Sequence, residues 1–158
     1  MRLFFAIWPP REAALELERW ARPLAGRCTP VDKIHLTLAF LGEASADRAT
    51  AAARRVQGAP FHLPLEEARY WPHNQIVWAG PRTPPPELAR LAESLHLELF
   101  RESFILERRP FAAHVTLLRK APRQAVPPLP AVEWRVGEFA LVSSQAGAYR
   151  TLERFALG

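Results

Sequence analysis

The sequence has 158 residues, 49% of them hydrophobic and 23% charged, which indicates one folded domain over residues 1–158 and excludes a disordered chain. Its one cysteine, Cys28, excludes an internal disulfide and a cysteine-based metal cage. The net charge of +5 favours a phosphate-bearing partner because guanidinium groups match phosphate oxygens, although a biased arginine content gives the same charge.

Alternating and helical patterns of apolar residues follow one another along the chain, which predicts a mixed α/β fold. Alternation predicts strands over residues 2–8, 33–41, 112–119, 134–142 and 148–156. Helical spacing predicts helices over residues 11–23, 46–57 and 87–101, the second capped by Ser45. Residues 61–65 alternate and residues 75–79 form an apolar run, so we expect a hairpin or two neighbouring strands there.

Hydrophobic runs are too short for a membrane segment. The longest uncharged run, residues 70–81, falls below the roughly 18 apolar residues that a membrane helix requires. The apolar residues 3–8 are too short and too early for a signal peptide. We therefore expect a cytoplasmic protein without a membrane partner.

Two tetrads share one pattern and lie 79 residues apart, His35-Leu36-Thr37-Leu38 and His114-Val115-Thr116-Leu117. Chance gives roughly 0.2 His-x-Thr pairs in a chain of this composition. Since side chains alternate along a strand, each histidine shares a face with the threonine two residues on. If the two strands lie side by side, two imidazoles and two hydroxyls line one groove.

Such a groove suits acid–base cleavage of a phosphodiester. One neutral histidine takes a proton from the attacking oxygen, and one protonated histidine gives a proton to the leaving oxygen. The hydroxyls of Thr37 and Thr116 would hold the non-bridging oxygens, where negative charge builds up.

The repeated tetrads resemble the signature of the two-histidine phosphoesterase superfamily. Segments 2–7, 35–42, 114–119 and 147–155 are similar to the RNA 2′,3′-cyclic phosphodiesterases, also called the 2′-5′ RNA ligase or LigT-like family. The resemblance covers essentially the whole chain. It implies a bilobal α/β fold, with two pseudo-symmetric lobes of antiparallel sheet and outer helices around a central cleft.

The resemblance also implies an activity and its residues. The activity is hydrolysis of RNA 2′,3′-cyclic phosphate ends, tRNA halves among them, to 2′-phosphate ends without metal or cofactor. Many members also join RNA ends through a 2′-5′ bond without ATP. The resemblance implies that His35 is the general acid that protonates the O3′ leaving group and that His114 is the base that activates water. In the reverse reaction the two residues exchange these roles.

The arginine that follows the second tetrad in the family matches Arg119, which is expected to contact the phosphate. Plain alternation places Arg119 on the face opposite His114. The strand must therefore twist, bulge or end there for the contact to form.

The remaining residues suggest no other chemistry. His62, His73 and His96 lack metal-ligand spacing, so no metal is expected, and no glycine-rich phosphate loop occurs. Among the aromatic residues, Trp8, Phe40 and Trp78 are expected in the core and Phe4 or Tyr149 at the cleft.

Two alternatives stay open. One is a non-catalytic module that binds single-stranded RNA through arginines and exposed aromatic residues, which leaves the tetrads unexplained. The other is a two-histidine phosphodiesterase that acts on another cyclic or 2′-5′ nucleotide. In every case we expect a monomer, because no long exposed apolar stripe is visible.

Overall fold

The computed structural model describes residues 1–107 and 109–158. Within these residues the helices are α1 (Arg11–Ala21), α2 (Ala46–Arg54), α3 (Pro86–Arg101) and a 3₁₀ helix (Val31–Lys33). The strands are β1 (Arg2–Ile7), β2 (Arg27–Cys28), β3 (Leu36–Glu43), β4 (Phe61–Leu65), β5 (Glu67–Trp71), β6 (Ile76–Gly80), β7 (Val115–Arg119), β8 (Val132–Val136), β9 (Glu138–Gln145) and β10 (Ala148–Ala156). No helix in the described part of the chain has the length and apolar character needed to cross a membrane.

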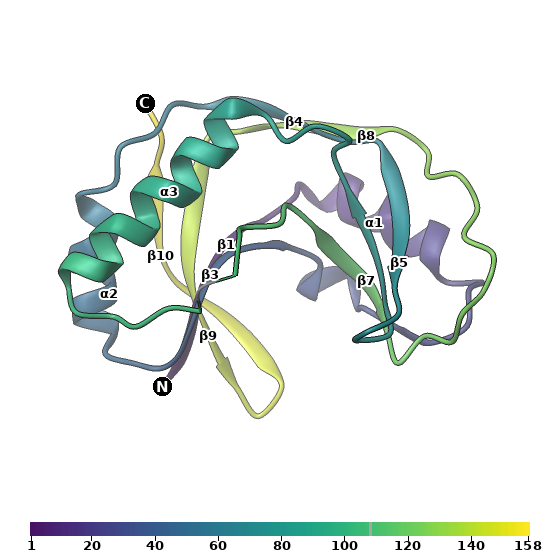
Figure 1. Cartoon of the computed structure of the whole chain (residues 1–158), viewed down its shortest axis with the longest axis horizontal. Coiled ribbons are helices and arrows are strands. Elements are labelled where there is room, and N and C mark those ends of the chain that lie inside the picture. Colours follow the sequence, from purple (N-terminus) through teal and green to yellow (C-terminus); the bar gives the residue numbers. More distant parts are fainter. Residues whose placement is uncertain (108) are drawn as a thin grey trace.

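The main sheet divides into two halves. Its described strands run in the order β10-β9-β1-β3-β7-β6-β5, with β2 paired to β7. β3 and β7 are joined through one residue pair, Leu36 with Val115, and the halves diverge from this junction (Figure 1). α2 and α3 cover the half that ends in β3, α1 packs on the half that begins with β7, and the separate β4–β8 pair runs between the halves (Figure 1). The predicted α/β fold of two antiparallel-sheet halves with outer helices is confirmed.

β3 and β7 each carry an extra residue at the same place in their tetrads, and β3 carries a second one, Leu41, farther along. The register shift against β1 makes Leu38 the extra residue of β3, and the shift against β6 makes Leu117 the extra residue of β7. Two consecutive side chains are buried at each bulge, Leu38 with Ala39 and Leu117 with Leu118, so the alternation resumes with the faces exchanged. The prediction that Phe40 lies in the core is wrong for this reason: Phe40 is 56% exposed.

Several strand assignments from the sequence differ from the structure. Residues 33–35 and 112–114 lie before β3 and β7 rather than within them, and Lys33 ends a 3₁₀ helix. β4 and β6 do not pair as a hairpin; β4 pairs with β8 and β6 pairs with β5. β5 was not predicted as a strand, because nearly all of its side chains are half-buried rather than alternately buried and exposed. The predicted strand 134–142 is interrupted at Gly137, which separates β8 from β9.

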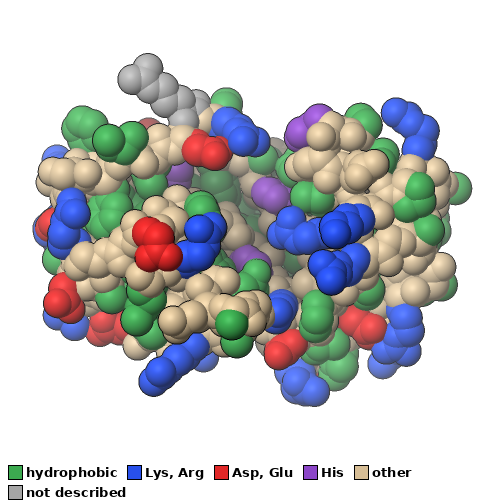
Figure 2. Space-filling model, turned by 90° about the horizontal axis from the view of Figure 1, so that it is seen from below, with side chains coloured by type: hydrophobic (Ala, Val, Ile, Leu, Met, Phe, Trp, Pro, Cys, Tyr) green, Lys and Arg blue, Asp and Glu red, His purple; other side chains and the backbone are tan. Residues whose placement is uncertain are grey.

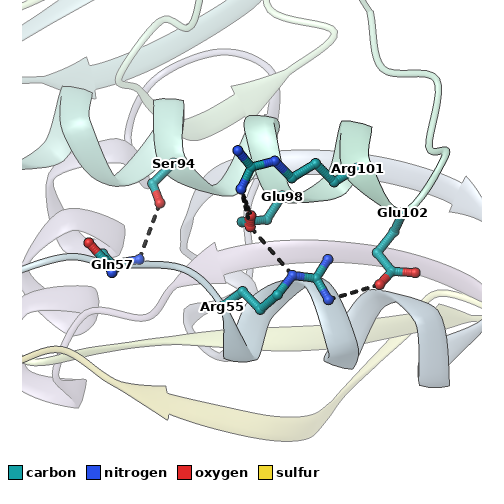
Figure 3. A network of polar contacts seen from close by, with 6 residues as sticks. All are labelled: Arg55, Gln57, Ser94, Glu98, Arg101 and Glu102. Atoms are coloured by element: carbon teal, nitrogen blue, oxygen red, sulfur yellow. Dashed lines mark hydrogen bonds and ion pairs between the residues drawn. The ribbon is translucent and has the colours of Figure 1, made fainter.

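Charged residues around one buried carboxylate tie α2 to α3 (Figure 3). Glu98 on α3 is 4% exposed and accepts hydrogen bonds from Arg101 Nη1 at 2.8 Å and Arg55 Nε at 3.4 Å. From the same helix, His96 Nε2 lies 3.0 Å from the carbonyl oxygen of Leu38. α3 therefore supports β3 at the bulge of the first tetrad.

Candidate active site

The tetrads meet at a cavity of about 510 Å³ between the two halves. Figure 2 shows this face hollowed at its middle, with histidine side chains inside the hollow and lysine and arginine side chains along its margin. The lining residues are Arg27, Cys28, Thr29, Pro30, Lys33, His35, Thr37, His114, Thr116, Arg119, Gly147 and Tyr149. All five site residues predicted from the sequence thus face one space, and no carboxylate is among the described lining residues.

The two histidine rings are anchored in the same way. Nδ1 of His35 lies 2.7 Å from the carbonyl oxygen of Lys33, and Nδ1 of His114 lies 2.8 Å from the carbonyl oxygen of Ala112. Because a carbonyl only accepts, Nδ1 must carry the hydrogen in both rings. Nε2 is therefore the nitrogen left for chemistry, and in His35 it lies 2.9 Å from Thr37 Oγ1.

Aromatic side chains pack on both histidines. The ring of His35 lies 5.0 Å from Phe4 and 5.6 Å from Tyr149, measured between centroids. Of the two aromatic residues expected at the cleft, Tyr149 lines the cavity, whereas Phe4 is buried behind the His35 ring. The ring of His114 lies 4.7 Å from Trp71, a contact that the sequence did not reveal because β5 lacks an alternating pattern. These rings restrict the imidazoles and exclude water from one side of each.

Burial lowers the pKa of both histidines. Loss of hydration disfavours the charged imidazolium and is the main cause for His35 and for His114. The carbonyl hydrogen bonds oppose this shift, and the positive charge of Arg119 adds to it in both rings. Both imidazoles are consequently neutral at pH 7 in the unliganded protein.

Arg119 reaches the cavity because of the bulge in β7. With Leu117 and Leu118 both buried, the next side chain turns to the face that Thr116 occupies. Arg119 lines the cavity with Thr116 and His114. Of the three ways in which the sequence allowed Arg119 to approach the histidines, a twist, a bulge or the end of the strand, the structure shows a bulge.

Arg27 and Lys33 also line the cavity and were not singled out from the sequence. The Lys33 ammonium donates to the carbonyl oxygen of Gly147 and lies 5.2 Å from the ring centroid of Tyr149. Neither residue belongs to a tetrad. Arg27 stands in a two-residue strand without a pattern of its own, and Lys33, which alternation assigned to the strand 33–41, ends a 3₁₀ helix. Among the described residues, no three His, Cys, Asp or Glu side chains gather into a metal site.

Comparison with known proteins gives the same family from sequence and from structure. Residues 7–78 match the family model described as LigT like Phosphoesterase. An Escherichia coli K12 protein named RNA 2′,3′-cyclic phosphodiesterase is 40% identical, covering 99% of this chain and 96% of that protein. A Thermus thermophilus protein of the same name is 36% identical over 99% of this chain and 90% of its own length.

Among solved structures, E. coli LigT in complex with 3′-AMP superposes with a TM-score of 0.91 at 38% identity, covering 99% of this chain and 97% of that one. The chain therefore belongs to the LigT-like phosphoesterase family.

Proposed function

We propose that the protein hydrolyses RNA 2′,3′-cyclic phosphate ends to 2′-phosphate ends by acid–base catalysis with two histidines. The observation that carries this proposal is the matched anchoring of His35 and His114. In each ring Nδ1 binds a backbone carbonyl, so Nε2 is the nitrogen available for proton transfer, in a cavity lined by lysine and arginine side chains. The two full-length relatives that bear the name RNA 2′,3′-cyclic phosphodiesterase support the same substrate.

In this mechanism water attacks the phosphorus as its proton passes to Nε2 of His114. The bond between phosphorus and O3′ breaks, and Nε2 of protonated His35 gives its proton to O3′. The products are a 2′-phosphate and a 3′-hydroxyl, and the rings return to their starting states through exchange with solvent. Thr37, Thr116 and Arg119 hold the non-bridging oxygens, where charge builds up.

The substrate itself helps to charge the acid. Both rings are neutral before binding because burial lowers the pKa of each. A bound phosphodiester anion favours the protonated form of a nearby ring. Proton transfer and charge stabilisation are then both supplied by side chains, so the reaction we propose needs no metal ion or cofactor.

The same arrangement can join RNA ends, if a 5′-hydroxyl takes the place of water and the product is a 2′-5′ phosphodiester. We infer that the chain works as one two-lobed domain and as a monomer, since this chain alone supplies both histidines and the three other side chains that the proposed reaction uses. RNA with cyclic ends, such as tRNA halves, would be met in the cytoplasm.

The test uses a short RNA that ends in a 2′,3′-cyclic phosphate, incubated with EDTA. Wild type should produce an end that a 3′-specific phosphatase cannot remove. His35→Ala and His114→Ala should each be slower by about 10²–10⁴-fold. The control Arg90→Ala, an exposed change on α3, should keep the wild-type rate.

Turnover that survives both histidine substitutions would contradict the proposal. RNA binding that depends on arginines but not on histidines, without turnover, would instead establish a binding module. Turnover of another cyclic or 2′-5′ nucleotide alone would reassign the substrate.

A further inference from the structure

The cavity holds more positive charge than one cyclic phosphate requires. A 2′,3′-cyclic phosphate is a monoanion, and Arg119 already provides a cation beside both histidines. Arg27 also lines the cavity, and neither arginine side chain has a hydrogen bond or ion pair with any residue that the structure describes. The surplus charge therefore needs an explanation.

The two arginines stand directly opposite each other on neighbouring strands. Arg27 of β2 is the partner of Arg119 of β7 in the antiparallel ladder. Directly opposite side chains lie on the same face, about 4.5–5.5 Å apart at their backbones, and like charges in such a pair destabilise the sheet. An anion between or beyond the two guanidinium groups removes this repulsion.

The segment that carries Arg27 is fixed against β7 rather than free. Gly26 has φ +131°, and a Cβ at this position would lie 3.0 Å from Cα of Ala121, so glycine allows the close approach of the two segments. The backbone nitrogen of Thr29 donates to the carbonyl oxygen of Leu117 at 2.8 Å. Arg27 is thus held at a defined position on the cavity wall.

That position lies away from the reacting groups. β6 occupies one side of β7, so β2 and β3 pair with its other side, β3 at Val115 and β2 at Leu118 and Arg119. Four residues along a strand span roughly 13 Å, which separates Arg27 from the junction beside the histidines. The charge of Arg119 acts on both rings and lowers the pKa of each, whereas Arg27 lies on the strand beside it, which continues the line of β3 along β7.

We propose that Arg27 binds the next phosphate of the RNA chain, the 5′-phosphate of the nucleotide that carries the cyclic phosphate. This inference rests on the proposed function and adds to it a preference for RNA ends over isolated nucleosides with a cyclic phosphate. The arginine pair then contacts two successive phosphates, Arg119 the reacting one and Arg27 its neighbour. Arginine suits this task because its planar group binds two phosphate oxygens together.

The test measures binding and needs no turnover. Adenosine 2′-phosphate and adenosine 2′,5′-bisphosphate are titrated calorimetrically into wild type, Arg27→Ala, Arg27→Lys and the control Arg90→Ala, at one pH and salt concentration with EDTA. Wild type and the control should bind the bisphosphate more tightly. Arg27→Ala should lose about tenfold to hundredfold in affinity for the bisphosphate, with its affinity for the monophosphate unchanged, and Arg27→Lys should fall between.

Equal weakening of both nucleotides by Arg27→Ala would overturn the inference, because Arg27 would then act on the shared 2′-phosphate. An unchanged preference for the bisphosphate, or no binding of either nucleotide to wild type, would overturn it as well. Failure of the proposed function is a separate observation, a wild-type protein that leaves cyclic RNA ends intact, and the binding ratio does not depend on it.

Discussion

The charged network between α2 and α3 should respond non-additively to removal of its arginines. Glu98 is buried, whereas the side chains of Arg55 and Arg101 are 44% and 62% exposed. Either arginine alone can neutralise Glu98, so Arg55→Ala or Arg101→Ala alone should lower the free energy of unfolding only slightly, because each arginine is largely solvated. The double variant leaves a buried carboxylate without a partner and should cost about 3–5 kcal/mol.

Urea unfolding followed by circular dichroism measures these differences, and the excess of the double over the summed single effects gives the coupling. Adding Glu98→Leu to the double variant should restore much of the lost stability, because no buried charge then remains. Additive single effects, or no recovery on adding Glu98→Leu, would refute the reasoning. Arg90→Ala on the same helix serves as the matched surface control.

Three further outcomes are expected at the site. The optimum of kcat/KM should lie below pH 6.5. The two limbs of this profile report the pKa values of His35 and His114 in the free enzyme, and both are lowered. An optimum above pH 7 would contradict this. Arg119→Ala should reduce kcat by about 10²–10³-fold, with partial recovery in Arg119→Lys; steady-state kinetics that show only a raised KM would contradict a role in charge stabilisation. Gly26→Ala should lower the free energy of unfolding by about 1–3 kcal/mol through its positive φ and its contact with Ala121, and urea midpoints equal to wild type would contradict it.

The tetrads could be predicted from the sequence because the relation between a histidine and the threonine two residues on is local. Strand alternation alone places His35 with Thr37 and His114 with Thr116. Alternation also indicated that the strand must twist, bulge or end for Arg119 to face the cleft. It could not locate the bulge, because an extra residue is defined only against a partner strand, here β6.

Arg27 and Trp71 illustrate what the sequence did not reveal. Arg27 stands in a two-residue strand whose partner lies far along the chain, and Trp71 ends a strand without alternating burial. The bulges in the two tetrads have opposite effects on the sequence predictions. The bulge in β7 brings Arg119 into the cavity as expected, whereas the bulge in β3 turns Phe40 out of the core. Contacts of this kind depend on sheet register rather than on local pattern.

The most direct test of the paired-histidine mechanism replaces the leaving oxygen. A cyclic substrate with sulfur in place of the bridging O3′ has a leaving group that departs as a thiolate and needs no general acid. His35→Ala should recover most of its lost rate on this substrate, whereas His114→Ala, which lacks the base, should stay slow. Recovery of His114→Ala instead would reverse the two roles, and recovery of neither variant would contradict general-acid catalysis by this pair.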